Sequence, residues 1–149
     1  METDLLTSLI GKKLAVLEKI RQLSRRQSEL IGQGEMTGLM NVLAVKQTLI
    51  VELTDIERQL DPFREQDPDR RQWRSQDDRL HCRGMAERCA ALLQEIMLVE
   101  RQCEGEIRTR RDDVAHKLDR INHASHAHSA YMNFAPHTTS SQLDLTSER

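Results

Sequence analysis

One group of side chains that could bind a metal ion or carry a redox reaction consists of the three cysteines. They are Cys82, Cys89 and Cys103, so successive thiols lie seven and fourteen residues apart. Seven residues make two turns of an α-helix, which places the thiols on one helix face about 10 Å or more apart. Zinc ligands on a single helix need a spacing of three or four residues. We therefore expect the cysteines to pack in a helical core as small apolar groups, and their odd number argues against a disulfide framework.

Histidines form the second group, in the segment Asn-His-Ala-Ser-His-Ala-His that contains His123, His126 and His128. His123 and His126 are three residues apart and could share a metal ion on a helix, but His128 points to another side. No acidic residue lies among them after Asp119. We expect no metal site here, because imidazoles at a helix end face solvent and interact favourably with the helix dipole. Metal binding by these histidines is the alternative.

Charged side chains crowd residues 101–121, which include six basic and five acidic residues. Arg108, Arg110 and Arg111 are followed at once by Asp112 and Asp113, so opposite charges nearly cancel. We expect a solvated face, with a charged rim around a partner-binding surface as the alternative. Over the whole chain, 22 basic and 24 acidic residues give a net charge of −2. The basic excess of a nucleic-acid-binding protein is missing, so we expect no nucleic-acid partner.

Catalytic motifs are missing from the sequence. It contains no nucleophile elbow, phosphate-binding loop or paired-carboxylate pattern, and long paired helices offer no natural concave pocket. We expect neither an enzyme nor a cofactor. The first residues are acidic and lack a secretory signal, and no run of about 18 apolar residues occurs. These features predict a cytoplasmic protein without membrane insertion.

Three long helices are expected to position these residues. Aromatic residues make up 3% of the chain and charged residues 31%, a composition typical of amphipathic helices. Apolar residues recur every three or four positions, which predicts helices over about residues 4–31, 35–60 and 75–130. Thr3 or Asp4 is expected to cap the first helix, and Ser75 the third. The apolar stripe of the second helix consists of Met36, Leu39, Met40, Leu43, Leu49, Ile50, Leu53, Ile56 and Leu60.

Glycine and proline mark the predicted helix ends. The first helix is expected to end at Gly32, because Gly32-Gln33-Gly34 tolerates the positive φ of a tight turn. Such a short link predicts an antiparallel hairpin of the first two helices. Asp61-Pro62 is expected to end the second helix, since proline disfavours helical geometry in the residue before it. A polar connector over residues 62–74, which contains Phe63 and Trp73, leads to the third helix.

The third helix is longer than either partner. It can run antiparallel to the second helix for about 26 residues, as far as Cys103 and Gly105. Beyond that point no helix of the same chain remains to cover it. Its apolar positions also become sparse there, and they are Ile107, Val114, Leu118 and Ile121. We therefore expect an overhanging apolar strip on the C-terminal half of this helix.

These elements predict an all-α fold, with an antiparallel helical hairpin plus a long third helix. A single helical domain is expected over residues 1–130. The helix is expected to break at Phe134-Ala135-Pro136, and the Ser- and Thr-rich residues 131–149 to form a flexible tail.

The first two helices resemble those of the FlgN-type flagellar export chaperones. The shared pattern is a leucine-rich helix, a short glycine-containing break, and a helix with lysine and glutamine near its middle. In this chain the break is Gly32-Gln33-Gly34-Glu35-Met36, and Lys46-Gln47 stands among Leu39, Leu43, Leu49-Ile50 and Leu53. A basic C-terminal helix follows and ends in small residues with one tyrosine, Ser129-Ala130-Tyr131. The resemblance covers about residues 5–131.

This resemblance implies a cytoplasmic chaperone without ATPase activity. Chaperones of this family hold the aggregation-prone C-terminal helices of hook–filament junction proteins and deliver them to the membrane export gate of the flagellar type III apparatus. The family's C-terminal region binds the client, which in this chain implies client binding at Ile107, Val114, Leu118 and Ile121. A tyrosine near the end engages the export gate, and Tyr131 matches that position.

A structural coiled-coil protein is the alternative. Positions 103, 107, 110, 114, 117/118 and 121 approach a heptad pattern, so residues 104–130 could pair with their own copy in a homodimer. Arg110 and Lys117 occupy core-type positions of that pattern.

Overall fold

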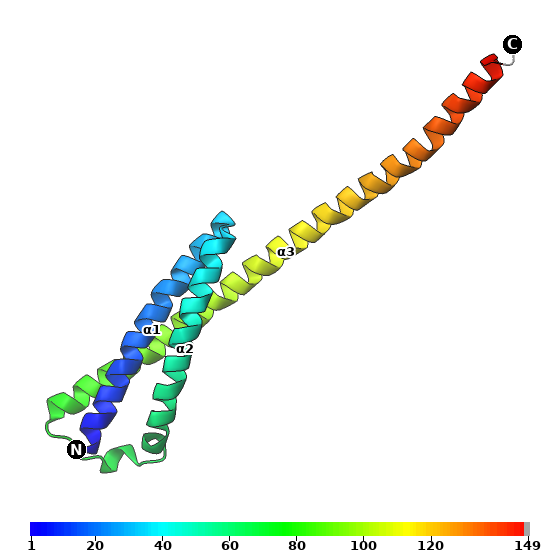
Figure 1. Cartoon of the computed structure of the whole chain (residues 1–149). Coiled ribbons are helices and arrows are strands. Elements are labelled where there is room, and N and C mark those ends of the chain that lie inside the picture. Colours follow the sequence, from blue (N-terminus) through cyan, green and yellow to red (C-terminus); the bar gives the residue numbers. More distant parts are fainter. Residues whose placement is uncertain (148–149) are drawn as a thin grey trace. The chain divides into compact units, whose positions relative to one another are not determined.

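The chain is all-α in a computed structural model, which describes the backbone of residues 1–147 and the side chains of residues 1–133. Three helices, α1 (Glu2–Gln33), α2 (Met36–Arg64) and α3 (Gln76–Ser147), follow one another, with the short 3-10 helix η1 (Pro68–Arg70) between α2 and α3 (Figure 1). This confirms the predicted hairpin and long third helix. The chain divides into two compact units, Met1–Glu106 and a second that begins at Ile107, and each is described by itself.

A single left-handed glycine makes the hairpin turn. Gly34 has φ 69° and ψ 21°, which is the only positive φ among the described residues. Its N–H donates to the Ile31 carbonyl at 3.0 Å, and the Glu35 N–H donates to the Leu30 carbonyl at 2.9 Å. These bonds satisfy carbonyls that the end of α1 would otherwise leave unpaired. The turn is the predicted one, with α1 ending at Gln33, one residue past Gly32.

The start of α1 differs from the prediction. The helix begins at Glu2, so Thr3 and Asp4 lie inside its first turn and neither is the cap. The Thr3 hydroxyl instead donates to the Gln72 carbonyl at 2.9 Å, and the Asp4 carboxylate accepts from Arg74 at 2.7 Å. Both side chains therefore fasten the connector to α1. For α3 the predicted cap is confirmed, because the Asp78 N–H donates to the Ser75 hydroxyl at 3.1 Å.

The end of α2 also differs, since the helix runs through Pro62 to Arg64. Proline removes one N–H and so frees the carbonyl of Arg58, four residues earlier. Arg58 is exposed, where solvent can satisfy that carbonyl, and the loss falls in the last turns of the helix. Phe63, the next residue, is 7% exposed and packs in the core. Burial of its ring holds the last turn of α2 in place.

Two clusters of buried side chains hold the first unit together. The larger cluster joins all three helices, and the smaller one lies at the α1–α2 turn. Because α3 passes the start of α1 first and reaches the turn last, it runs antiparallel to α2, as predicted. The larger cluster contains Leu6, Leu9, Val16, Leu17, Ile20, Leu49, Ile56, Leu60, Phe63, Cys82, Cys89, Leu92 and Ile96. The smaller contains Leu30, Ile31, Leu39 and Cys103.

Helix α3 does not end near residue 130 as expected. Its backbone continues through Tyr131 and Pro136 to Ser147. A carbonyl freed by proline on a solvent-exposed helix can accept a hydrogen bond from water, so one proline does not by itself stop the helix. Residues 148 and 149 lie outside the described residues. The mobility of residues 131–149 stays a prediction.

Candidate partner-binding surface on α3

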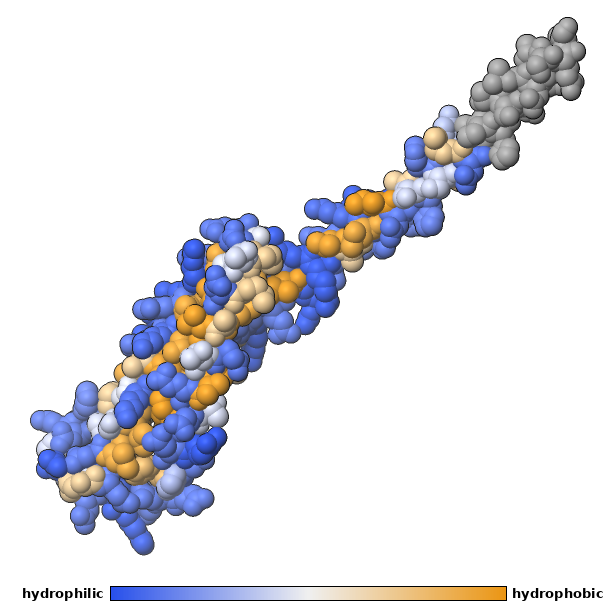
Figure 2. Space-filling view, viewed as in Figure 1, coloured by the Kyte–Doolittle hydropathy of each residue, from blue (hydrophilic) through white to orange (hydrophobic). Residues whose placement is uncertain are grey.

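Apolar side chains on one face of α3 change from buried to exposed within a single turn. Cys103 is 1% exposed and is the last buried residue of the described side chains. The next apolar position is Ile107, which is 43% exposed, and Val114, Leu118 and Ile121 are 55%, 54% and 61% exposed. We call these four residues the α3 strip. Figure 2 shows apolar side chains on this part of the chain between stretches of hydrophilic surface.

The α3 strip occupies a narrow face. At about 100° per residue, its four side chains fall within an arc of about 60°. The buried residues Cys82, Cys89, Ile96 and Cys103 fall within about 40° of Ile107 by the same measure. The strip therefore continues, in helical phase, the face that α3 uses in the core.

Charged and polar residues occupy the remaining surface around the strip. From Ile107 to Asn133 every described side chain is exposed, except Arg110, which is half-buried. Arg111 and Asp112 form a loose ion pair at 3.8 Å between side chains that are themselves exposed. Such a pair adds little stability. The arrangement is a solvated charged surface that borders an apolar strip.

Tyr131 and Met132 lie further along α3. The Tyr131 side chain is exposed, and its position falls about 120° from the strip in helical phase. Met132, also exposed, falls on the strip face, eleven residues or about three turns after Ile121. Sequence reasoning missed Met132, although the three-turn spacing from Ile121 would have indicated it.

A polar cluster fixes α3 against both other helices just before the strip. Lys46 of α2 is buried, and its Nζ donates to Gln27 Oε1 at 2.6 Å and to the Glu100 carboxylate. The Ser24 hydroxyl donates to Glu100 at 2.8 Å, and the Gln27 amide at 3.4 Å. Burial on its own would raise the pKa of Glu100, but the hydrogen bonds from Lys46, Ser24 and Gln27 outweigh it and hold the pKa below its usual value. The buried ammonium is thus paired and hydrogen-bonded.

The cysteines and histidines lie in opposite environments. Cys82, Cys89 and Cys103 are buried free thiols, which confirms core packing. Burial raises the pKa of Cys89 and of Cys103, which disfavours the thiolate form of both side chains. The histidines His123, His126 and His128 are exposed. Among the described residues no group of three or more His, Cys, Asp or Glu side chains is arranged to hold a metal ion.

Sequence reasoning missed a second apolar surface, on α2. Four members of its predicted apolar stripe, Met36, Met40, Leu43 and Ile50, are exposed, because α1 and α3 cover only part of so wide a stripe. Between Met36 and Val51 the one charged residue is Lys46, which is buried, so this exposed surface carries no charge. The exposed apolar residues of α2 are Met36, Met40, Leu43, Val45, Ile50 and Val51.

By length and composition alone, α2 is also the one helix of the described chain that could cross a membrane. Of the 18-residue segment of α2 that has this composition, 17% is buried. A mostly buried helix in the core of a soluble protein meets the same criterion. The absence of membrane insertion stays a prediction.

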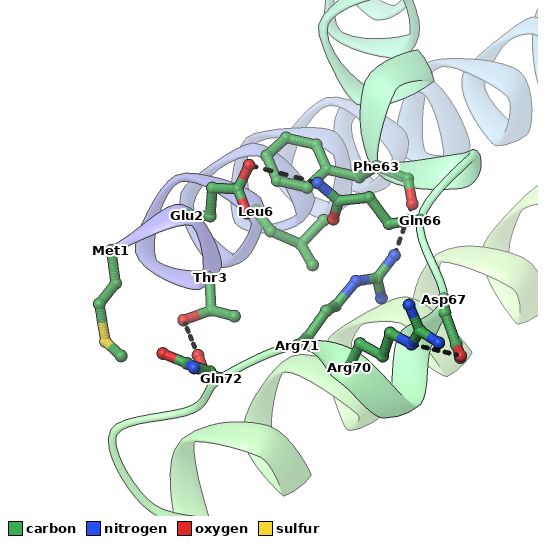
Figure 3. A pocket seen from close by; sticks show the side chains of 10 residues that line it. All are labelled: Met1, Glu2, Thr3, Leu6, Phe63, Gln66, Asp67, Arg70, Arg71 and Gln72. Carbon is green, nitrogen blue, oxygen red and sulfur yellow. Dashed lines mark hydrogen bonds and ion pairs between the residues drawn. The ribbon is translucent and has the colours of Figure 1, made fainter.

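The first unit is hollowed at the end where the connector lies. This differs from the expectation that paired helices leave no concave pocket. A cavity of about 550 Å³ lies between the first turn of α1, the end of α2 and the connector (Figure 3). Arg71 reaches across its wall and donates to the Phe63 carbonyl at 2.6 Å. The polar connector creates this hollow, because it spans the gap between two helix ends without filling it.

Comparison with protein-family models, curated proteins and solved structures found no match to this chain.

Proposed function

We propose that this protein is a flagellar export chaperone of the FlgN type, which binds hook–filament junction proteins and keeps them unassembled until export. The observation that supports this most directly is the α3 strip: four apolar side chains at helical spacing, 43–61% exposed, on a solvated helix. A soluble protein exposes such a row at an energetic cost unless a partner covers it. The sequence resemblance in the hairpin and at Ser129-Ala130-Tyr131 supplies the client class.

In this proposal the client's C-terminal helix lies along the α3 strip. An amphipathic client helix would cover Ile107, Val114, Leu118 and Ile121 with its own apolar face. Each Å² of apolar surface removed from water contributes about 25 cal/mol. A disordered client loses entropy when it becomes ordered, so the affinity is moderate and release at the export gate needs no ATP. Tyr131, exposed and off the strip, would remain accessible for the export-gate contact.

Replacement of Ile107 and Leu118 by aspartate tests the client site. Both positions are exposed, so the variant keeps its helical circular dichroism spectrum while two charges oppose burial of the strip. We expect capture of a hook–filament junction protein in a pull-down to fall at least tenfold, a loss of about 1.4 kcal/mol.

Aspartate at His116 and His123 provides the matched control. These exposed positions fall on the opposite face of α3, about 160–180° from Ile107, and the substitutions add the same number of carboxylates. Capture should stay at the wild-type level. Equal capture by the Ile107/Leu118 variant and the wild type would show that the client does not bind the strip.

Self-association is the alternative that the same strip favours, because its spacing approaches a heptad. Light scattering on the full chain separates the two functions. A monomer agrees with the chaperone proposal. A stable dimer that the Ile107→Asp, Leu118→Asp variant converts to monomer would favour a structural coiled-coil protein that pairs through residues 104–130.

A further inference from the structure

A second cavity lies at the same connector end of the first unit, and its walls are apolar and cationic. Its volume is about 320 Å³, near the lower end of the range for small-molecule sites, about 300–1,000 Å³. The connector, α1 and α3 contribute its lining, which contains no carboxylate. The apolar lining residues are Leu6, Ile10, Pro68, Trp73, Cys82 and Ala86, and the cationic ones are Arg71, Arg79 and Arg83.

Arg71 is the most constrained of the three cations. It lines this cavity and the neighbouring cavity of Figure 3. Its Nη2 donates to the Phe63 carbonyl, but its Nε is buried and has no hydrogen-bond acceptor. Among the described residues no carboxylate pairs with this guanidinium. A buried donor without an acceptor costs free energy, and a charged donor costs more.

Arg79 and Arg83 are placed unfavourably for helix stability. They are four residues apart, so their like charges repel on one side of α3. Arg79 also lies in the fourth helical position, close to the positive end of the helix dipole. Arg83 pairs with Glu87 at 3.2 Å, whereas Arg79 has no acidic partner among the residues that the structure describes. An anion between these side chains would relieve all of these costs together.

We propose that this cavity, which we call the base pocket, binds a small amphiphilic anion: an acidic head group attached to a short apolar chain. The head group would accept hydrogen bonds from Arg71 and Arg79, since charge-assisted bonds from guanidinium to an oxyanion are strong. The apolar chain would lie against Leu6, Ile10 and the ring of Trp73. This site is separate from the α3 strip and its function goes beyond client binding.

Trp73 provides the measurement, because it is the only tryptophan in the chain and lines the base pocket. We use decanoate as the probe, at concentrations below those at which it forms micelles. Decanoate should change Trp73 fluorescence saturably and raise the melting temperature of the full chain. Decyltrimethylammonium, which has the same chain and the opposite charge, should do neither.

Single arginine variants test the head-group contact. Arg79→Gln replaces an exposed side chain, so the protein folds normally, and decanoate affinity should fall at least tenfold, as loss of a charge-assisted hydrogen bond implies. Arg58→Gln is the matched control, because Arg58 is exposed on α2 and does not line the base pocket, and its affinity should stay unchanged. Equal binding of the cationic analogue, unchanged affinity of Arg79→Gln, or no saturable change in the wild type would each overturn the proposal.

Discussion

Two stretches of α3 have the same pattern of apolar residues and opposite surroundings. Up to Cys103 the pattern is buried against α1 and α2, and Leu92 is 0% exposed. From Ile107 the pattern continues in the same helical phase, and every member is more than 40% exposed. The difference shows that periodicity determines which face of a helix is apolar, whereas the lengths of neighbouring helices determine how much of that face is covered.

The α1–α2 turn marks where cover ends. Cys103 packs with Leu30, Ile31 and Leu39, which flank the turn at Gly34. No residue of α1 or α2 lies beyond the turn. The polar cluster around Lys46 and Glu100 lies one turn of α3 before Cys103 and holds all three helices together there.

The largest expected effect on the free energy of unfolding comes from alanine substitution of one leucine in each stretch, Leu92 and Leu118. Leu92→Ala should lower the free energy of unfolding by about 3–4 kcal/mol, because it removes buried methyl groups and leaves a cavity. Leu118→Ala should change it by less than about 0.5 kcal/mol, because that side chain is already exposed. Urea unfolding followed by circular dichroism measures both. A loss above 1 kcal/mol for Leu118→Ala would mean that the strip is covered in the free protein.

A fall in pH should destabilise the buried stretch of α3 and leave the exposed stretch unaffected. Because the folded pKa of Glu100 lies below its usual value of 4.5, ionised Glu100 stabilises the fold above that pH. This stabilisation is lost as the pH falls through the lowered pKa. Glu95 acts in the same direction, since its hydrogen bond from Arg25 and the neighbouring Arg21 lower its pKa. Melting temperature measured from pH 6 to pH 3 should therefore fall.

Glu100→Gln tests the source of that dependence. The variant keeps an acceptor for Lys46 but removes the ionisable carboxyl, so its melting temperature should vary less with pH below 4.5 than that of the wild type. Asp119→Asn, in the exposed stretch, is the control and should leave the pH dependence as it is. An unchanged slope in Glu100→Gln would show that the polar cluster does not govern acid stability.

Most of the fold could be predicted from the sequence, because each helix carries a strong apolar period and glycine marks the hairpin turn. The start of α1 and the end of α2 could not, since both depend on contacts with the connector. Thr3 bonds to Gln72 rather than capping, and burial of Phe63 carries α2 past Pro62. How much of the α2 stripe is buried could not be predicted either. A periodic pattern gives the width of an apolar face, but the packing of neighbouring helices determines how much of that face is buried.

More of the α3 strip than of the base pocket could be predicted from the sequence. Exposure of Ile107, Val114, Leu118 and Ile121 followed from helix lengths alone, which are readable in sequence. The base pocket requires Arg71 and Trp73 of the connector to meet Arg79 of α3 and Leu6 of α1, which are separated by up to 73 positions in the chain. No local pattern encodes that meeting.

Replacement of glycine by alanine in each stretch should have the smallest effect on the free energy of unfolding, and it tests where the boundary between the two stretches lies. Gly84 and Gly105 both lie inside α3, and a Cβ at either position would meet nothing within 4 Å. Alanine is favoured over glycine in a helix by about 0.5–1 kcal/mol, so Gly84→Ala should stabilise the first unit by about that amount. Gly105→Ala should add only a few tenths, because it follows Cys103, the last buried residue, and helix formation there is weakly coupled to the core. Urea unfolding again measures both. Equal gains would mean that α3 unfolds cooperatively past Gly105, and that the exposed strip belongs to the same folding unit as the core.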